Sequence, residues 1–389
     1  MRVITVGEVV KIISGFAFKS DMFNEEENGI PLIRIRDVGQ NNPATYYNGE
    51  YKEEYLVSKG NLLISMDGEF KISEWLGPVS LLNQRVCKIE SSSPELLEKY
   101  LLYILPDALK KIEDSTPYVT VKHLSVSDIR KIQIRLPSIS EQRFIIDILD
   151  KAQTLVDKRK QAITKLDELV QVLFLDMFGN PTANQKGYPI GTIKDLIIEA
   201  KYGTSKKANE GSGQFPYLRM NNITYQGYMY YSNLKYIDLD DKEQEKYLVQ
   251  TGDLLFNRTN SKELVGKTAV FDSNEKMAIA GYLIRVRIND KGNPYFVSGY
   301  LNSKHGKKVL QEMCKNIIGM ANINAQEMQN ISILIPPKEL QDSYEKKYRA
   351  IIQQKEKHFI QLQQLESNFQ ALLQKAFKGE LKVKDGVAV

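Results

Sequence analysis

The sequence predicts a mixed α/β (α+β) protein made of two copies of one unit, in which a globule is followed by a long helix. Three observations favour this fold class. Short sequence blocks occur twice in the same order, the blocks have the apolar patterning of strands joined by turns, and each copy ends in a heptad repeat. We therefore expect two homologous domains separated by two long antiparallel coiled-coil helices, with pseudo-twofold symmetry.

The repeat is carried by three blocks rich in apolar residues. They are residues 31–38, which return as 216–223, residues 56–64, which return as 248–256, and residues 124–129, which return as 323–328. The distance between the copies grows from 185 to 192 and then to 199 residues, so insertions lie only between the blocks. In the second block Gly60 and Gly252 each precede an Asn or Asp and an apolar run, which is typical of a turn leading into a buried strand.

A long helix is expected after each globule. Ser138 and Glu141 have the spacing of a capping box directly after a proline, which indicates a helix start. In the second copy Leu340 stands where the first has Glu141, so the same capping arrangement is not expected there. Both helices are expected to end alike, at Gly179 and Gly379, because glycine suits the position after a helix C-terminus.

Apolar residues recur every seven positions along both predicted helices, with a second seam position between them. A seam of four to five heptads is long for a helix that packs only on its own globule, although that alternative stays open. We expect the helices to pair with each other through Leu149, Ala152, Val156, Arg159, Ile163, Leu166, Val170 and Leu173 of the first and Ile351, His358, Leu362, Leu365, Phe369 and Leu372 of the second.

One pair of equivalent seam positions is polar in both helices. Arg159 and His358 are equivalent under the 199-residue repeat, and Arg159 lies near the middle of its helix. Equivalent positions of an antiparallel pair meet where the pseudo-twofold axis crosses, so a central polar layer is expected, with Asp157 and Glu356 as counter-charges. The alternative is that both side chains extend to solvent.

These elements set the expected domain boundaries. They are a first domain at 1–139, a central helix at 140–180, a second domain at 181–337, a C-terminal helix at 338–381 and a tail at 382–389.

Composition excludes some classes of protein. The net charge of +5 permits a polyanionic partner but does not require one. No apolar run reaches the length of a membrane-spanning helix, so no membrane partner is expected. Cys87 and Cys314 are the two cysteines and lie far apart, which argues against a disulfide scaffold or zinc site and fits a reducing cytoplasm.

Three fragments resemble catalytic motifs but lack the required context. Residues 211–213, Gly-Ser-Gly, are not preceded by a buried strand as a nucleotide-binding turn would be. Residues 293–296, Asn-Pro-Tyr-Phe, resemble the tetrad of adenine methyltransferases without its second proline, and align with a plain helix start at residues 93–95. Residues 67–71 resemble a nuclease Asp…Glu-x-Lys pattern that has no counterpart at 259–262. We expect no catalytic residue, no metal site and no cofactor bound by this chain.

Loops that follow corresponding strands carry side chains suited to nucleic acid. Lysine and arginine neutralise phosphates, while arginine pairs with guanine and asparagine with adenine in the major groove. Residues 201–207 are expected to correspond to residues 14–20. Ordinary solvated loops remain the alternative for any one residue. The candidate DNA-binding residues are Phe18, Lys19, Ser20, Ser65, Met66, Asp67 and Lys71 in the first copy, and Lys201, Tyr202, Gly203, Thr204, Ser205, Lys206, Lys207, Asn257, Arg258, Thr259 and Asn260 in the second.

The duplicated motifs resemble a known family, the specificity subunits of type I restriction–modification systems. The resemblance rests on the Pro-x-[LI]-Arg block, the [LV]-x-x-Gly-[DN]-[LV]-[LI] block, the proline-ended strand before Ser140-Glu141-Gln142, and the helix ending on Phe-Gly. It extends over roughly residues 3–381. Each motif is weak alone, but their duplicated order is specific.

The resemblance implies two target-recognition domains that read a bipartite, asymmetric site in double-stranded DNA with an unread gap. It implies two docked methyltransferase subunits, which carry S-adenosylmethionine and methylate adenine N6 after base flipping. Restriction subunits with ATP and magnesium can join them. The chain itself would be a non-catalytic subunit in the cytoplasm of a bacterium or archaeon. Two alternatives stay open: a two-headed adaptor for RNA or protein, and a stand-alone DNA methyltransferase.

Overall fold

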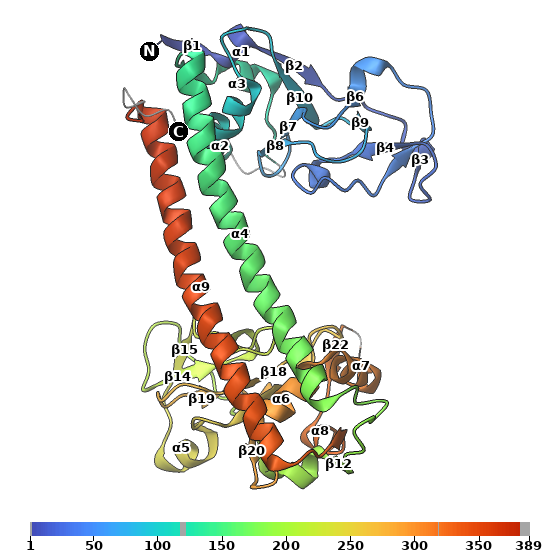
Figure 1. Ribbon diagram of the computed structural model, residues 1–389, viewed down its shortest axis with the longest axis vertical. Helices are drawn as coiled ribbons and strands as arrows, with labels where there is room; N and C mark the ends of the chain where they lie inside the picture. The colour runs from blue at the N-terminus through green and yellow to red at the C-terminus, as the bar shows by residue number, and fades with distance from the viewer. Residues whose placement is uncertain (1, 117–121, 318, 382–389) are drawn as a thin grey trace. The chain divides into compact units, whose positions relative to one another are not determined.

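The computed structural model describes residues 2–116, 122–317 and 319–381 of the chain (Figure 1). It divides into two compact units, Met1–Lys158 with Leu362–Val389 and Arg159–Gln361. Each unit contains one globule and a segment of each long helix, so the compact units cut across the helices, whereas the boundaries expected from the sequence follow the ends of elements. The expected tail at 382–389 lies outside the described residues.

The first globule is built on a four-stranded antiparallel sheet in the order β2-β10-β7-β8. These strands are β2 (Val10–Ser14), β10 (Val86–Ser91), β7 (Leu62–Ser65) and β8 (Ile72–Glu74). A second sheet contains β3 (Phe23–Asn24), β5 (Tyr46–Tyr47), β4 (Ile30–Ile33), β9 (Ser80–Leu82) and β6 (Leu56–Val57), and β1 (Arg2–Thr5) pairs with β11 (Gln133–Leu136). The helices are α1 (Val6–Val9), α2 (Glu98–Ser115) and α3 (Val126–Lys131), with 3-10 turns η1 (Ser20–Met22), η2 (Ile35–Asp37) and η3 (Glu53–Tyr55).

The second globule repeats this plan with the sheet β13-β20-β16-β18. Its strands are β13 (Ile197–Tyr202), β20 (Leu283–Ile288), β16 (Leu254–Asn257) and β18 (Thr268–Val270). The smaller sheets contain β12 (Ile190–Thr192) with β23 (Ser332–Leu334), β15 (Lys235–Ile237) with β14 (Phe215–Leu218) and β19 (Ala278–Ile279), and β17 (Thr259–Asn260) with β22 (Met320–Asn322) and β21 (Lys315–Ile317). The helices are α5 (Asp241–Tyr247), α6 (Pro294–Asn302), α7 (Lys304–Met313) and α8 (Ala325–Gln329), with 3-10 turns η4 (Ile193–Leu196) and η5 (Met220–Asn222).

The structure confirms the repeat at the level of elements. The three blocks form β4 and β14, β7 and β16, and α3 and α8. Gly60 and Gly252 adopt left-handed φ values of 97° and 95°, which explains why glycine precedes the buried strand in both copies. Ser125 and Asn324, also equivalent, cap α3 and α8 by accepting a backbone N–H.

Each central sheet is buried on both faces because successive side chains of a strand point in opposite directions. In β7, Leu62 and Ile64 pack in one core cluster with Leu105 of α2, whereas Leu63 packs in another with Trp75. In β16, Leu254 and Phe256 pack with α6, whereas Leu255 packs on the opposite face. This two-sided burial accounts for the nearly continuous apolar runs in the sequence.

The long helices are α4 (Ile139–Phe178) and α9 (Lys338–Lys378). In the first unit Leu149, early in α4, shares a core with Ala376, late in α9. In the second unit Phe174, late in α4, shares a core with Tyr344, early in α9. The helix segments in each unit therefore run antiparallel, as expected.

Burial follows the predicted seam. Leu149, Val156, Ile163 and Val170 are all at most 8% exposed. The other seam positions are half-buried: Ala152, Arg159, Leu166 and Leu173 in α4, and Ile351, His358, Leu362, Leu365, Phe369 and Leu372 in α9. The heptad pattern thus marks the more buried face of each helix.

The polar contacts expected between Arg159, His358 and their counter-charges are not formed among the described residues. Within the described part of the chain, Arg159 has no hydrogen bond or ion pair with His358, Asp157 or Glu356, and His358 Nε2 contacts Gln354 of its own helix at 2.9 Å. The expected pairing with counter-charges was wrong, because a shared position in the repeat does not by itself bring charged side chains into contact.

The polar contact between the helices in the second unit is an ion pair of Lys355 with Asp167. Lys355 is 7% exposed, and its Nζ lies 3.9 Å from the centre of the Tyr228 ring, whose hydroxyl donates to Asp167 at 2.8 Å. The contact therefore joins both helices and the globule.

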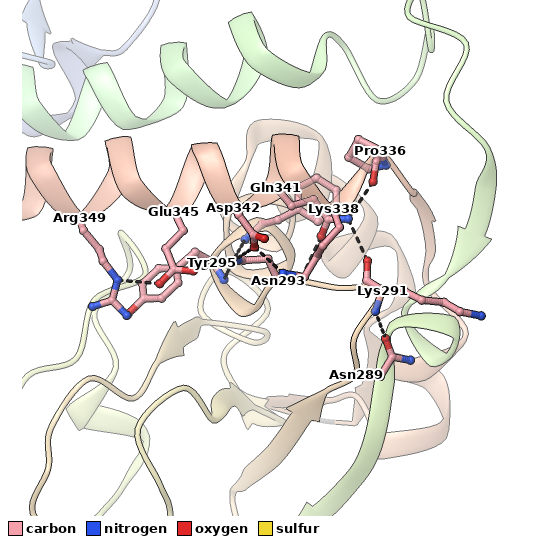
Figure 2. A network of polar contacts seen from close by, with 11 residues as sticks. Asn289, Lys291, Asn293, Tyr295, Pro336, Lys338, Gln341, Asp342, Glu345 and Arg349 are labelled. Carbon is pink, nitrogen blue, oxygen red and sulfur yellow. Dashed lines mark hydrogen bonds and ion pairs between the residues drawn. The ribbon is translucent and has the colours of Figure 1, made fainter.

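Buried glutamines anchor each helix start. Gln341 donates from Nε2 to the carbonyls of Pro336 (2.9 Å) and Lys291 (3.1 Å), and its Oε1 accepts the Asn293 N–H at 2.9 Å (Figure 2). Its counterpart Gln142 makes the same set of contacts in the first unit, with the carbonyls of Pro137 and Glu95 and the N–H of Leu97. Both side chains are completely buried, so each helix is fixed to its globule by three hydrogen bonds.

The helix ends also agree with the sequence. Ser138 and Glu141 form the capping box, with Glu141 Oε2 accepting the Ser138 N–H at 2.9 Å. The second helix has no equivalent carboxylate at Leu340, and Lys338 pairs instead with Asp342 at 2.5 Å. Gly179 and Gly379 adopt left-handed φ values of 77° and 72°.

Candidate nucleic-acid interface

The candidate interface lies along one edge of each four-stranded sheet. In the second unit, β13 and β16 both pair antiparallel with β20, so their C-terminal ends meet the N-terminal end of β20 at the same edge. In the first unit β2 and β7 meet β10 in the same way. We call these edges, with the residues that directly follow or precede those strand ends, the two loop edges.

The loop edge of the second unit combines aromatic, cationic and amide side chains. The Arg258 guanidinium carbon lies 4.8 Å from the centre of the Tyr202 ring, and the Tyr202 hydroxyl accepts the Ala325 N–H at 2.9 Å. Thr259 Oγ1 donates to Asn322 Oδ1 at 2.9 Å. A guanidinium stacked on an aromatic ring keeps a fixed direction, which suits it to a bidentate contact.

The loop edge of the first unit is an ionic cluster. Asp67 accepts from His123 Nδ1 at 2.6 Å and pairs with Arg85 Nε at 3.4 Å. The Arg85 Nη1 atom lies 3.2 Å from the same imidazole nitrogen. Since a carboxylate can only accept, the proton of the Asp67–His123 hydrogen bond belongs to the imidazole.

The two loop edges have the same backbone frame. In the first, the Met66 N–H donates to the Arg85 carbonyl at 2.8 Å and the Leu124 N–H donates to the Met66 carbonyl at 2.7 Å. In the second, the corresponding bonds run from Arg258 to Tyr282 and from Ile323 to Arg258, both at 2.9 Å. The frame is therefore constant while its side chains differ.

A pair of glycines permits this frame. A Cβ on Gly15 would lie 1.9 Å from the Asn83 carbonyl oxygen, and one on Gly203 would lie 2.3 Å from the Ala280 carbonyl oxygen, so no side chain fits at either position. Gly203 therefore corresponds to Gly15, which corrects the expected alignment of residues 201–207 with 14–20 by one residue.

The structure brings part of the predicted set together. Tyr202, Gly203, Arg258, Thr259 and Asn260 gather at the second loop edge, and Asp67 and Lys71 lie at the first. The flanking side chains of Lys19, Ser20, Lys201, Ser205, Lys206 and Lys207 are exposed. These residues stay candidates for DNA contact.

Five predicted contact side chains point inward instead. Phe18, Ser65, Met66, Thr204 and Asn257 are all at most 7% exposed. Ser65 Oγ donates to the Glu69 carbonyl and accepts the Lys71 N–H, so it shapes the loop from within. The sequence suggested contact because these residues flank the strand ends, but β7 and β16 are buried on both faces up to their last residues, Ser65 and Asn257, and the burial extends into the adjoining loops.

Carboxylates neutralise two of the three lysines predicted in the second copy. Lys201 pairs with Glu199 at 2.6 Å and Lys206 with Glu243 at 2.9 Å. These hydrogen bonds hold the pKa of Glu199 and of Glu243 below the ordinary value. Lys207 has no ion-pair partner within residues 122–317 or the other described segments. Its positive charge is therefore not neutralised by a carboxylate.

Two further lysines border the second loop edge. Lys267 follows the 258–266 loop, and its Nζ donates to the carbonyls of Met220 and Ile223 at 2.8 and 2.6 Å. Lys307 Nζ lies 3.3 Å from the centre of the Tyr225 ring. Burial lowers the pKa of both groups, that of Lys307 to about 8. Both ammonium groups are thus used to hold the loops.

We expect the double substitution Lys206→Ala, Lys207→Ala to weaken binding to duplex DNA and to flatten its salt dependence. Each lost phosphate contact reduces the log–log salt slope by about 0.9. Titration of a labelled duplex at several salt concentrations measures both quantities.

The matched control is Lys194→Ala, Lys291→Ala, which removes the same charge from the opposite end of the sheet, where Ile197 pairs with Ile288. Equal slopes for the two double variants would contradict a DNA contact by residues 206 and 207.

Sequence reasoning missed four residues of the loop edges: Arg85 and His123 in the first, and Tyr282 and Asn322 in the second. They precede or flank strands that run antiparallel to the strands from which the candidate residues were predicted. The repeat offset of 197 to 199 residues aligns them, but only strand pairing places them beside Asp67 and Thr259.

One fragment that resembles a catalytic motif, residues 293–296, has a structural role. Asn293 caps α6 by accepting the Tyr295 N–H at 2.9 Å, and its Nδ2 donates to Asp342 and Glu345 of α9 (Figure 2). By its contact with the buried glutamine it corresponds to Leu97, which corrects the expected alignment with residues 93–95.

The other two fragments are residues 211–213 and residues 67–71. Residues 211–213 lie in a loop before β14. Within the described part of the chain, no group of three His, Cys, Asp or Glu side chains could hold a metal ion.

Comparison with protein families decides the class. The family model described as "Type I restriction modification DNA specificity domain" matches residues 1–167 and 185–377, once for each globule with its helix. The chain belongs to this family.

Relatives agree with this family over almost the whole chain. The EcoBI specificity subunit of Escherichia coli is 28% identical across 97% of this chain and 85% of its own length, and the EcoKI specificity subunit of Escherichia coli (strain K12) is 20% identical across 97% and 88%. The crystal structure of a type I S subunit from M. genitalium superposes with a TM-score of 0.56 at 15% identity, covering 98% of this chain and 96% of the other, which supports the fold.

Family membership confirms the expectation of a DNA specificity subunit. The function of this family is recognition of DNA sequence, and its members are non-catalytic components of restriction–modification complexes. The two alternatives, an RNA or protein adaptor and a stand-alone methyltransferase, do not fit the family. None of the described helices has the length and apolarity needed to span a membrane.

Proposed function

We propose that this chain reads a bipartite, asymmetric site in double-stranded DNA, one half with each loop edge. The observation that carries the proposal is the common backbone frame with different side chains. Arg85 and His123 of the first edge occupy the places of Tyr282 and Asn322 in the second. Two readers of this kind hold their side chains in similar positions and yet select different bases.

The paired helices then separate the half-sites and dock two methyltransferase subunits. Large apolar side chains stand exposed on the helix segments of the second unit, which supports a protein partner: Leu169, Val172 and Leu175 of α4, and Phe359 and Ile360 of α9. The docked subunits bind S-adenosylmethionine and methylate adenine N6, and two restriction subunits with ATP and magnesium can join the complex. This chain binds none of these cofactors.

Mapping of methylated adenines in cells that carry the partner subunits, with and without this chain, tests the proposal. We expect a two-part motif with an unread gap that disappears when the chain is absent. Arg258→Ala should relax one half of the motif by a factor on the order of 10 to 100, because a bidentate arginine–base contact discriminates by roughly 1–3 kcal/mol.

Arg36→Ala is the control for that substitution. Arg36 is an exposed arginine in the other globule, and its Nη2 donates to Thr45 Oγ1 at 3.2 Å. A symmetric or ungapped motif, or equal changes in both halves with Arg258→Ala, would overturn the division of reading between the globules.

A further inference from the structure

Arg85 has an unusual backbone for its residue type. Its φ is 71°, in the left-handed region that L side chains rarely adopt. The Met66 N–H bonded to its carbonyl and the Asp67 carboxylate on its side chain hold it there. Strain of this kind persists where the surroundings over-determine the conformation, and it often marks a functional position.

The side chain of Arg85 is both oriented and accessible. Its Nε faces Asp67 at 3.4 Å, while 49% of the side chain is exposed. Asp67 itself is 20% exposed and is fixed by the 2.6 Å hydrogen bond from His123. The carboxylate therefore holds Nε, and His123 Nδ1 lies 3.2 Å from Nη1. Nη2, which has no partner among the described residues, and the second N–H of Nη1 stay available to a ligand.

We propose that Arg85 is a specificity-determining residue of the first loop edge, and that it selects a guanine in the major groove of the half-site read there. Guanine alone presents two acceptors, N7 and O6, on its major-groove edge, which match the arginine fork. Asp67 and His123 are positioning residues that fix the direction of the fork. This inference rests on the proposed function and names one base contact within it.

The second loop edge explains why the contact is confined to one half-site. Tyr282 occupies the position of Arg85, and Thr259 and Asn322 replace Asp67 and His123. Hydroxyl and amide groups at these positions present no cationic fork. The arginine of the second edge, Arg258, stands at the position of Met66, so the two globules present their arginines at different places in the frame.

Arg85→Asn is the variant of choice, because asparagine tolerates the left-handed backbone and lacks the fork. In methylated-adenine maps we expect one guanine of one half-site to become degenerate, with discrimination reduced on the order of 10- to 100-fold. The gap should keep its length. The other half-site, the one that Arg258→Ala alters, should keep its sequence. Arg85→Lys should retain a weaker guanine preference.

Asp67→Asn tests the positioning role. It should lower guanine discrimination less than Arg85→Asn does, since the arginine remains but loses its ionic partner. Arg36→Ala, a matched exposed arginine beside an aspartate, should leave every letter of the motif unchanged.

The failures of the two proposals are distinguishable. Lack of a gapped motif with the unsubstituted chain would overturn the proposed function. A gapped motif whose letters are the same with Arg85→Asn would overturn the role of Arg85, and so would a change in the half-site that Arg258→Ala alters. If Arg85→Asn fails to accumulate, the Arg85→Lys and Asp67→Asn maps decide the question, and unchanged letters in both would reject the guanine contact.

Discussion

Insertion of one heptad into each long helix is expected to abolish most methylation at the natural site. Seven residues inserted after Lys160 in α4 and after Phe359 in α9, which are equivalent positions, preserve the seam and add roughly 10 Å to each helix. That length is about three base pairs at roughly 3.4 Å each, and it also turns the second half-site around the duplex. Forcing the natural site to fit would deform the DNA at a cost of roughly 1–6 kcal/mol, so methylation should fall about tenfold or more.

Sequencing of methylated genomic DNA measures this result. Any methylation that survives should keep both half-site sequences and change only the gap, because the helices need not contact bases. An insertion of four residues is the comparison, since it disturbs the heptad seam as a stutter and should lower stability as well. An unchanged gap in the seven-residue variant, or altered half-site letters, would show that the helices do not set the spacing.

Gln341→Leu is expected to lower the free energy of unfolding of the second unit by roughly 2–4 kcal/mol. The side chain makes three hydrogen bonds, and its removal leaves the Asn293 N–H and two carbonyls buried without this partner. For a unit of this size, each kilocalorie shifts the midpoint of thermal unfolding by about 2–4 °C. Calorimetry of the full chain measures the shift.

Gln142→Leu should destabilise the first unit by a similar amount, since its three hydrogen bonds are equivalent. Gln364→Leu is the control, because Gln364 has the same size and lies exposed on α9. If the Gln341 and Gln142 variants unfold at the same temperature as the control, the buried glutamines do not anchor the helices.

Much of the fold followed from local patterns. The capping box at Ser138 and Glu141 and the glycines at 179 and 379 mark the ends of the long helices, and the heptads mark their buried face. Such signals can be recognised in the sequence because they depend on backbone conformation and burial within one element. Each block also occurs twice in the same order, so blocks that are weak alone together become specific for the family.

Side-chain contacts between elements could not be predicted in the same way. In the second unit Lys355 and Asp167 form a polar contact between the helices that the repeat did not indicate, because the register of two packed helices depends on every side chain along the seam. Asn257 looked like a contact residue and is completely buried, because β16 is covered on both faces up to its last residue.

The loop edges show the same division between local and tertiary information. Asp67 and Arg258 were found because they follow buried strands that recur in the sequence. Arg85 and Asn322 belong to the same edges because antiparallel neighbours bring the start of one strand beside the end of another. That pairing joins residues 18 to 63 positions apart, a distance over which sequence patterns carry no register, so only the assembled sheet reveals which side chains stand together to read DNA.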